Sequence, residues 1–353
     1  MKKVKLYSML QALLSALLFA AGAPISKILL DDIEPISLAA FTYLGSGIGL
    51  FFFRRAVPLR ENNEECEAQI SKSDIKWLIG AVLAGGIIAP ILLMYGLRVT
   101  PGATASLLLN FEGVATIAIA GLIFKEAVGR RIYSAIALIT IASIILTFNF
   151  RDNWGFSTGG LGIIGACVLW GIDNNLTKNI SEKDPFAIVT IKGIGAGLFS
   201  LVLSFLAGSG FPGIHHILPA MLVGFFSYGL SIVLFIYAMR GLGASRTGIL
   251  FGTSPFLGVI LSFILLKEIP DFKFYFSLPL MIIGAVLILS EKHTHKHTHC
   301  ILEHEHRHSH DDGHHLHTHK EGIDIEHSHI HRHEASEHIH KHTPDIHHNH
   351  QHK

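Results

Sequence analysis

The chain is dominated by long runs of apolar residues, each bounded by a few polar or charged ones. A helix needs about 20 mostly apolar residues to cross a bilayer, and ten segments of the sequence approach that length. They are residues 7–29, 36–53, 75–97, 102–124, 131–149, 158–178, 185–208, 216–239, 243–266 and 273–290. Several are separated by only a turn, as in "RVTPG" and "RGLGA". The pattern predicts an all-α integral membrane protein, a compact bundle of ten transmembrane helices.

The composition agrees with such a bundle and excludes several other classes. Of the 353 residues, 50% are hydrophobic and only 16% are charged. Lysine plus arginine (28) nearly balances aspartate plus glutamate (27), so no basic excess indicates a nucleic-acid partner. No C-x-x-C pair and no G-x-x-x-x-G-K-[ST] motif of an ATP-driven pump occurs. We expect a protein that lies in the lipid bilayer, is not an enzyme, requires no cofactor and binds no nucleic acid.

The loop charges predict how the bundle is oriented. Lys and Arg collect on the cytoplasmic side of membrane proteins. Most of those in the short loops fall on the side of the N-terminus, among them Lys2, Lys3, Arg54 and Arg55. With ten spans, both termini are then cytoplasmic. We expect a multi-pass protein of the cell membrane whose final segment, residues 291–353, lies in the cytoplasm.

The two halves of the apolar part resemble each other. "YGLRVTPGATASLLLNFEGVATIAIAGLIFKE" from Tyr95 aligns without a gap with "YAMRGLGASRTGILFGTSPFLGVILSFILLKE" from Tyr237, an offset of 142. We therefore divide the chain into repeats over 1–150 and 151–290. Each repeat holds five spans, an odd number, so the second must enter the membrane from the opposite side. Inverted repeats of this kind are typical of secondary transporters, whose substrate site lies near the midplane.

These features resemble the EamA-like members of the drug/metabolite transporter superfamily over residues 7–290. The resemblance rests on the five-plus-five arrangement and on "A/G-x-x-A-S-L-L" at the start of the fourth span, here Gly102 to Leu108. It rests also on the acids that end spans four and nine, Glu126 and Glu268. The resemblance implies transport of small organic solutes, often amino acids or other metabolites and often outward. It leaves the substrate and a homodimer open.

Charged side chains inside the predicted spans are the first candidates for the functional site. A charge at mid-membrane costs at least about 2.5–3.5 kcal/mol on insertion scales. Glu112 lies ten residues into the fourth span, about 15 Å deep at 1.5 Å per residue. Lys192 lies seven residues into the seventh and is able to pair with it across the two halves. The carboxylate either accepts a proton in coupled transport, balances a substrate's ammonium group, or forms a structural ion pair.

Polar residues of the fourth and sixth spans complete the predicted substrate site. Asn110 lies two residues before Glu112 and therefore projects on a different face of the helix. In "WGIDNNLTK", Trp170 and Asn174 are four residues apart and share a face, with Asp173 beside them. Such a face suits an amphipathic small molecule, although Asp173 is equally consistent with a place at the inner water interface.

The segment 291–353 is rich in histidine, since all but two of the 25 histidines follow Ser290. It has no apolar periodicity, so we expect a disordered tail. Its recurring unit is H-x-H, which in an extended chain places two imidazoles on one side. Imidazole suits zinc, nickel, cobalt and copper. The predicted metal-binding residues are His293, His295, His297, His299, His304, His306, His308, His310, His314, His315, His317, His319, His327, His329, His331 and His333.

Together these patterns predict a secondary transporter, acting as an exporter of small organic metabolites such as amino acids, with a metal-binding cytoplasmic tail. Two alternatives stay open. One is a transporter of divalent nickel, cobalt or zinc whose tail captures the ion, and the other is a membrane-tethered metal buffer. The predicted span interiors hold no histidine and only one cysteine, Cys167. That favours the metabolite over a soft transition metal as the cargo.

Overall fold

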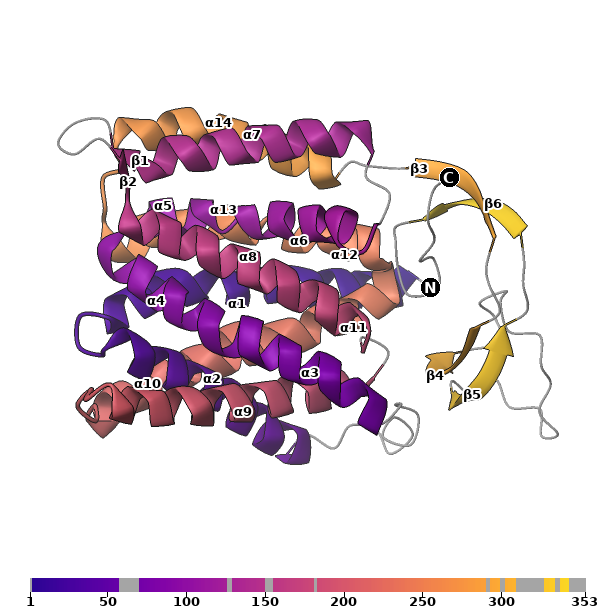
Figure 1. Cartoon of the computed structure of the whole chain (residues 1–353), viewed down its shortest axis with the longest axis horizontal. Helices are drawn as coiled ribbons and strands as arrows, with labels where there is room; N and C mark the ends of the chain where they lie inside the picture. Colours follow the sequence, from indigo (N-terminus) through magenta and orange to yellow (C-terminus); the bar gives the residue numbers. More distant parts are fainter. Residues whose placement is uncertain are drawn as a thin grey trace.

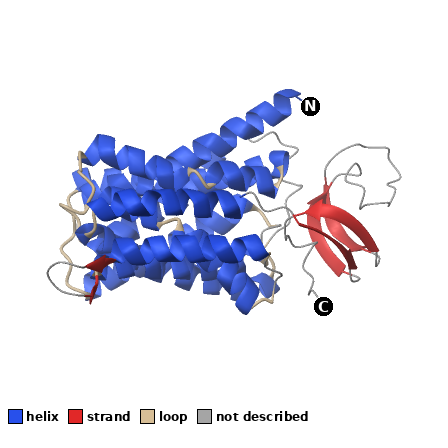
Figure 2. Cartoon of the chain, turned by 90° about the horizontal axis from the view of Figure 1, so that it is seen from above, coloured by secondary structure: helices blue, strands red, loops and turns tan. Residues whose placement is uncertain are grey.

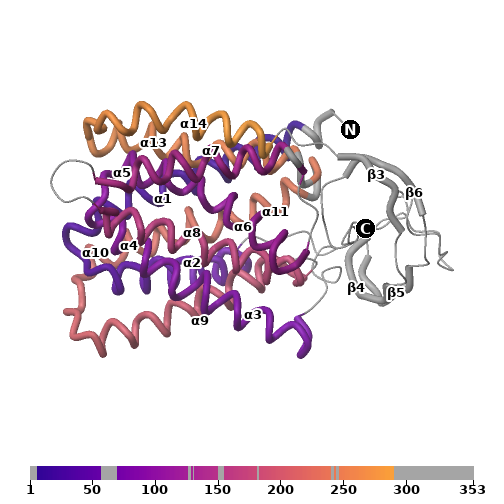
Figure 3. Tube along the Cα trace, turned by 45° about the horizontal axis from the view of Figure 1, so that its top comes forward, coloured from indigo at the N-terminus to yellow at the C-terminus, as the bar shows by residue number. Residues whose placement is uncertain are grey.

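The computed structural model describes most of the chain and forms a bundle of closely packed helices (Figure 1). The described residues are 2–56, 70–125, 129–149, 155–180, 183–289, 293–298, 302–308, 327–333 and 337–342. The helices run side by side along one axis, and both α1 and α2 lie within the bundle together with helices from the second half of the chain (Figures 1 and 3).

The first half of the chain builds its helices in the order of the apolar runs. Its elements are α1 (Lys2–Leu29), α2 (Pro35–Ala56), the 3₁₀ turn η1 (Lys72–Asp74), α3 (Ile75–Ala81), the π-helix η2 (Val82–Ile88), α4 (Ala89–Val99), α5 (Gly102–Leu108), α6 (Phe111–Leu122) and α7 (Arg130–Thr147). A two-stranded antiparallel sheet of β1 (Phe148–Asn149) and β2 (Gly155–Phe156) follows.

Apart from η1, the helices of the second half follow the same order. It comprises α8 (Thr158–Lys178), α9 (Pro185–Leu206), α10 (Ile214–Val223), the π-helix η3 (Gly224–Leu230), α11 (Ser231–Leu242), α12 (Ala244–Phe251), α13 (Ser254–Leu266) and α14 (Phe272–Leu289). Helices of the two halves pack against each other throughout: α2 against α9, α1 against α11 and α13, and α7 against α14.

The sequence offset of 142 recurs in the helix bounds. Adding 142 to the bounds of α7 gives those of α14, and adding it to the bounds of η2 gives those of η3. The two described non-glycine residues with positive φ, Lys125 (56°) and Lys267 (53°), are also 142 apart. Both follow the last helical turn of a span, where a left-handed residue ends a helix.

Eight helical segments among the described residues are long and apolar enough to cross a membrane, fewer than the ten that the sequence predicts. The other two predicted spans correspond to α7 and α8. The apolar stretch of α7 is shorter, Arg131–Thr147. The second half of α8 carries consecutive polar side chains, including Asp173, Asn174 and Asn175, which lower its hydropathy. Both segments nevertheless form helices.

Two glycines allow the backbones of neighbouring helices to approach closely. A Cβ on Gly45 of α2 would overlap the carbonyl group and Cα of Met221 in α10, and one on Gly224 of η3 would overlap the carbonyl group of Thr42. Small residues are typical of such contacts because they let helix backbones approach. Around them lies an apolar core that includes Leu93, Leu97, Leu107, Leu108, Ile163, Phe274 and Met281.

The histidine-rich segment contains paired strands where the sequence predicts disorder. They are β3 (His293–Thr298), β4 (Leu302–His308), β5 (His327–His333) and β6 (Glu337–His342), drawn in red in Figure 2. β3 pairs with β6 and β4 with β5, both antiparallel. The alternation of H-x-H has a period of two, which is also the period of a strand. The disorder that the sequence predicts for this segment is therefore not confirmed.

Candidate functional site

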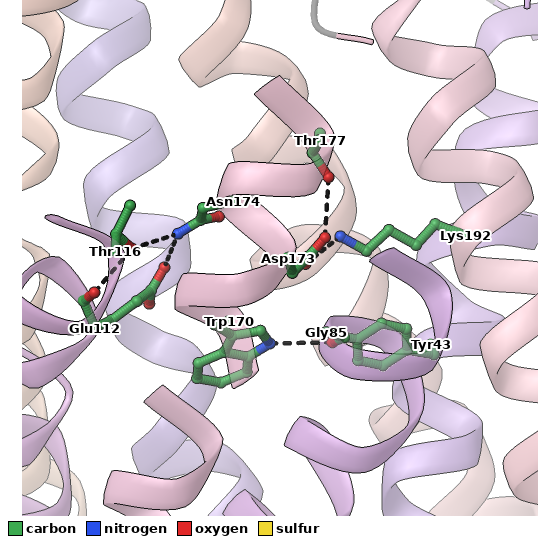
Figure 4. Close-up of polar contacts among 9 residues, drawn as sticks. All are labelled: Tyr43, Gly85, Glu112, Thr116, Trp170, Asp173, Asn174, Thr177 and Lys192. Carbon is green, nitrogen blue, oxygen red and sulfur yellow. Dashed lines mark hydrogen bonds and ion pairs between the residues drawn. The ribbon is translucent and has the colours of Figure 1, made fainter. Parts of the chain in front are cut away.

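The second half of α8 is polar on more than one face, although α8 packs against α3, η2, α4 and α6. Its residues Asp173 and Asn174 are neighbours in sequence and so project in directions about 100° apart. Each one meets a different helix. Figure 4 shows the two contacts on opposite sides of α8, with Glu112 on one side and Lys192 on the other.

On the α6 side, Asn174 binds Glu112. Its Nδ2 donates to Glu112 Oε1 at 2.9 Å and to Thr116 Oγ1 at 3.2 Å (Figure 4). The Thr116 hydroxyl in turn donates to the backbone carbonyl of Glu112 at 2.8 Å, four residues earlier in α6. Asn174 is exposed and Glu112 is half-buried. The Glu112 carboxylate is thus held by a neutral amide, on a half-buried residue within the helical segment Gly102–Leu122.

On the α9 side, Lys192 forms an ion pair with Asp173. Its Nζ donates to Asp173 Oδ2, and the hydroxyl of Thr177 donates to Asp173 Oδ1 at 2.9 Å. The two charged side chains are only 16% and 6% exposed. A charge can be buried away from water when it is paired with an opposite charge and hydrogen-bonded. Both conditions hold for Asp173, because Lys192 balances its charge and both of its carboxylate oxygens accept hydrogen bonds.

Next to this pair, one backbone oxygen joins three helices. The carbonyl of Gly85 in η2 accepts a hydrogen bond from Tyr43 Oη of α2 at 2.7 Å and one from Trp170 Nε1 of α8 at 3.1 Å (Figure 4). π-helical turns often occur at functional sites because they reposition backbone groups. A Cβ on Gly85 would overlap the Asp173 carboxylate, so glycine is required for the ion pair to fit here.

Two of the predicted residues, Lys192 and Asn110, have partners other than Glu112. Lys192 pairs with Asp173 rather than with Glu112, because α8 lies between α6 and the lysine. Asp173 is only 4% exposed, so its side chain is enclosed by the neighbouring helices. Asn110 is buried, and its side chain donates to the carbonyl of Leu107 three residues earlier. It lies between α5 and α6, bonds back to α5, and takes no part in the hydrogen bonds of Glu112.

The remaining predicted residues fall on or beside these two contacts. Asn174 binds Glu112, and Trp170 lies beside Asp173, although its ring hydrogen-bonds to Gly85 and does not share a contact with Asn174. Sequence reasoning missed Tyr43 and Gly85, together with the two threonines. Tyr43 is a single tyrosine inside an apolar run and Gly85 contributes a backbone atom, so neither has a clear sequence signal.

The predicted metal-binding histidines have a mixed outcome. His299, His310, His314, His315, His317 and His319 lie outside the described residues, whereas the other ten lie in β3, β4 and β5. Where the structure describes side chains, no group of three or more His, Cys, Asp or Glu is placed to hold a metal ion.

The fold and the site define the class of the protein: a multi-pass helical membrane protein with a charged and amide-bearing cluster inside its spans. The profile of the EamA-like transporter family matches residues 6–148 and 157–290. The chain therefore belongs to the EamA-like transporter family, and it is a membrane transporter. This confirms the family resemblance that the sequence predicts.

Two comparisons with single proteins agree. An uncharacterized transporter of Methanothermobacter thermautotrophicus (strain Delta H) is 32% identical over 277 residues, which cover 75% of this chain and 80% of that one. A solved crystal structure superposes with a TM-score of 0.56 at 14% identity and covers 79% of this chain and 95% of its own. At that identity the second likeness concerns the fold alone.

Proposed function

We propose that the protein is a secondary transporter that exports small organic metabolites carrying an ammonium group, such as amino acids. The observation that carries this proposal is the Glu112–Asn174 contact: a half-buried carboxylate inside a predicted span that is held by a neutral amide and by no cation. An unbalanced charge at that depth is costly, and a substrate's ammonium group is one way to balance it. The residues proposed to form the site are Glu112, Asn174, Asp173, Lys192 and Trp170.

The mechanism that we propose is alternating access between two inverted repeats. In this proposal α7 and α8 also cross the membrane, which gives ten spans and places both termini and the tail in the cytoplasm. Inverted repeats bring the substrate site to the interface of the two halves. The recurrence of η2 as η3, and of α7 as α14, supports a common origin of the halves.

We also propose that the histidine-rich tail binds zinc, nickel, cobalt or copper. The support is the strand register. In the β3–β6 pair His293, His295 and His297 lie opposite His342, His340 and His338, and in the β4–β5 pair His304, His306 and His308 lie opposite His331, His329 and His327. Alternate residues of a strand share a face and directly opposite Cβ atoms are about 4.5–5.5 Å apart. Each pair of strands thus aligns six histidines in three opposed pairs.

One comparison separates metabolite export from metal export. The full chain and a chain ending at Ser290 are expressed in a sensitive host, and resistance to toxic amino-acid analogues is measured beside resistance to zinc, nickel and cobalt. We expect both forms to protect against the analogues and only the full chain to protect against metals. Metal resistance from both forms would instead identify the membrane part as a metal transporter.

Replacing Glu112 with glutamine tests the site. The amide keeps the shape and loses the charge, so we expect transport to fall by at least about tenfold, the usual loss for a charge-assisted contact. Transport is measured in proteoliposomes, with Asn110→Ala as the control, because the Asn110 side chain bonds to the carbonyl of Leu107 in α5 and not to Glu112. If Glu112→Gln transports as well as the natural protein does, Glu112 is not part of the substrate site.

The pairing of β4 with β5 leads to a prediction that differs from the one for H-x-H units that bind metal independently. Replacing His327, His329 and His331 of β5 with asparagine removes one partner from every opposed pair of the β4–β5 sheet. We expect the loss of tightly bound zinc to be as large as when the β4 histidines are replaced as well, as measured by titration calorimetry on the full chain. Replacing Ser328 and Ile330, which alternate with these histidines along β5, should change little. Losses that add strand by strand would contradict the pairing.

A further inference from the structure

The four strands of the histidine-rich tail share one register. Nine residues separate His293 of β3 from Leu302 of β4, and nine residues also separate their partners, His342 of β6 and His333 of β5. A register that continues unchanged from one strand pair to the next is that of a single antiparallel hairpin. One arm of this hairpin is β3 with β4, the other is β5 with β6, and residues 309–326 connect the two arms.

The histidines of the sequence follow this register. They have odd numbers in β3 and β5 and even numbers in β4 and β6. Since the register pairs odd residues with even ones, as in His293 with His342, histidine lies opposite histidine three times in each strand pair. A change from odd to even on only one arm would have placed the histidines of one strand pair opposite other residues. The matched change on both arms therefore supports a single hairpin.

Each strand pair thereby forms an array of six opposed histidines. The outer array consists of His293, His295, His297, His338, His340 and His342, and the inner array consists of His304, His306, His308, His327, His329 and His331. Directly opposed Cβ atoms are about 4.5–5.5 Å apart, and the next opposed pair, two residues along, is about 7 Å away. Two neighbouring pairs thus provide four imidazoles, the number of ligands that a tetrahedral zinc ion takes.

Apart from the histidines, the arms have little that would hold them together. Leu302, Ile330 and Ile339 are the only apolar residues in the four strands, and one pair of opposite charges, Glu303 with Arg332, lies across the register. A two-stranded hairpin is marginally stable at best in water. Metal ions that bridge opposed histidines stabilise it, because the free energy of metal binding is then also free energy of folding.

The two arrays close chain loops of different length. The inner array closes residues 309–326, about 18 residues. Without the inner array, the outer array must close residues 299–336, about 38 residues. Once the inner array is closed, only three residues on each arm separate the two strand pairs. The entropy cost of closure grows as 3/2 RT times the logarithm of the loop length, so this shortening raises the metal affinity of the outer array by roughly tenfold.

We infer that the tail is a single hairpin that binds two divalent transition-metal ions in order, first at the inner array and then at the outer array, and that the first ion strengthens the binding of the second. The inference rests on the metal binding proposed above and adds the order and the coupling. The second ion is bound at least as tightly as the first, because the loop that it closes is the shorter one. The arms therefore close at a threshold of free metal, over a narrower range than independent H-x-H units would need.

A titration of zinc into four forms of the full chain tests the coupling. The forms are the natural chain, one with the inner array replaced by asparagine, one with the outer array so replaced, and one with both replaced, which measures the zinc held by other groups. Zinc affinities are obtained by competition with a chromophoric chelator. We expect the product of the two affinities of the natural chain to exceed the product of the affinities of the two single-array forms by about tenfold.

The same titration tests the order. The form that retains only the inner array should bind zinc about threefold more tightly than the form that retains only the outer array, because its loop is about half as long. Its affinity should equal that of the first ion in the natural chain. A form with only the outer array that binds more tightly than one with only the inner array would reverse the order.

Spin labels on the arms measure closure directly. Labels are attached at Thr294→Cys and Lys341→Cys, which are directly opposed in the outer strand pair. Cys66 and Cys300 are replaced by serine, and the remaining cysteine is buried. We expect strong dipolar broadening when zinc fills both arrays, and about tenfold more zinc should be needed when the inner array has been replaced. Labels at Thr294 and Ser328, which belong to different strand pairs, are the matched control and should show no broadening.

Three results overturn the inference, and they separate it from the proposed function. Equal products of the affinities would show that the arrays fill independently, which removes the single hairpin but leaves a metal-binding tail. Broadening between Thr294 and Ser328 as strong as between Thr294 and Lys341 would show that the arms collapse without this register. If the natural chain binds no more zinc than the form without either array, the metal-binding tail proposed above is wrong as well. Transport of amino-acid analogues by the same four forms is measured alongside, so that a failure of the tail is distinguished from a failure of the transporter.

Discussion

Replacing Gly45 with alanine should strongly destabilise the bundle. The added methyl group would overlap the carbonyl group and Cα of Met221. Since the obstacle is the backbone of α10, no side-chain rotation relieves it, and α2 must move away from α10. Overpacking usually costs about 1–3 kcal/mol, and we expect this backbone collision to reach or exceed the upper value. The check is the melting temperature of the purified full chain in detergent, followed by size-exclusion chromatography after heating.

Gly248 of α12 is the matched control. A Cβ there would have no heavy atom within 4 Å. Alanine is also favoured over glycine in a helix by up to about 1 kcal/mol. Gly248→Ala should therefore leave the melting temperature unchanged or raise it. If Gly45→Ala and Gly248→Ala melt at the same temperature, the close approach of α2 and α10 is wrong.

Removing the cation of the buried ion pair should have a comparably large effect. Lys192→Met leaves the carboxylate of Asp173 buried without a balancing charge, and breaking such a pair from one side costs about 3–5 kcal/mol. The double variant Asp173→Asn with Lys192→Met has no buried charge left, so it should melt closer to the natural protein than the single variant does. The two melting temperatures, with that of Asp173→Asn, form a double-mutant cycle.

Lys72→Met provides the control for loss of a lysine as such. Lys72 is exposed at the start of η1, and substitutions at such sites usually change stability by no more than about 0.5 kcal/mol. If Lys192→Met is as mild as Lys72→Met, or if the double variant is less stable than both single variants, the ion pair does not contribute in the way proposed.

Hydrophobicity alone located the helices well. Every predicted span corresponds to helix in the structure, because a run of about 20 apolar residues has few alternatives in a membrane. The positions of the π-helical turns and of the breaks within those helices were not predictable. The predicted span 75–97 contains the π-helix η2, and the predicted span 102–124 is divided between α5 and α6 at residues 109–110. Periodicity does not distinguish these states, because they differ in which backbone groups pair.

The sequence indicated which charged residues belong to the candidate site, but it did not indicate which of them contact each other. Glu112, Asp173 and Lys192 stand out in the sequence because each is a charge within an apolar run. Which of them meet depends on the rotation of each helix about its axis, and Asp173 and Asn174, adjacent in sequence, turn to opposite neighbours. The acceptor at Gly85 is a backbone oxygen, which every residue has. No pattern of side chains could therefore indicate it.

The hydrogen bonds to the Gly85 carbonyl restrict how the transporter can change shape. Tyr43 of α2, Gly85 of η2 and Trp170 of α8 meet at a single oxygen atom. Any displacement of one of these three helices against the others by more than a fraction of a bond length breaks at least one of the two bonds. In the alternating-access mechanism that we propose, we therefore expect these three helices to move together. We expect the relative movement of the two halves where this group meets α6, the helix that carries Glu112.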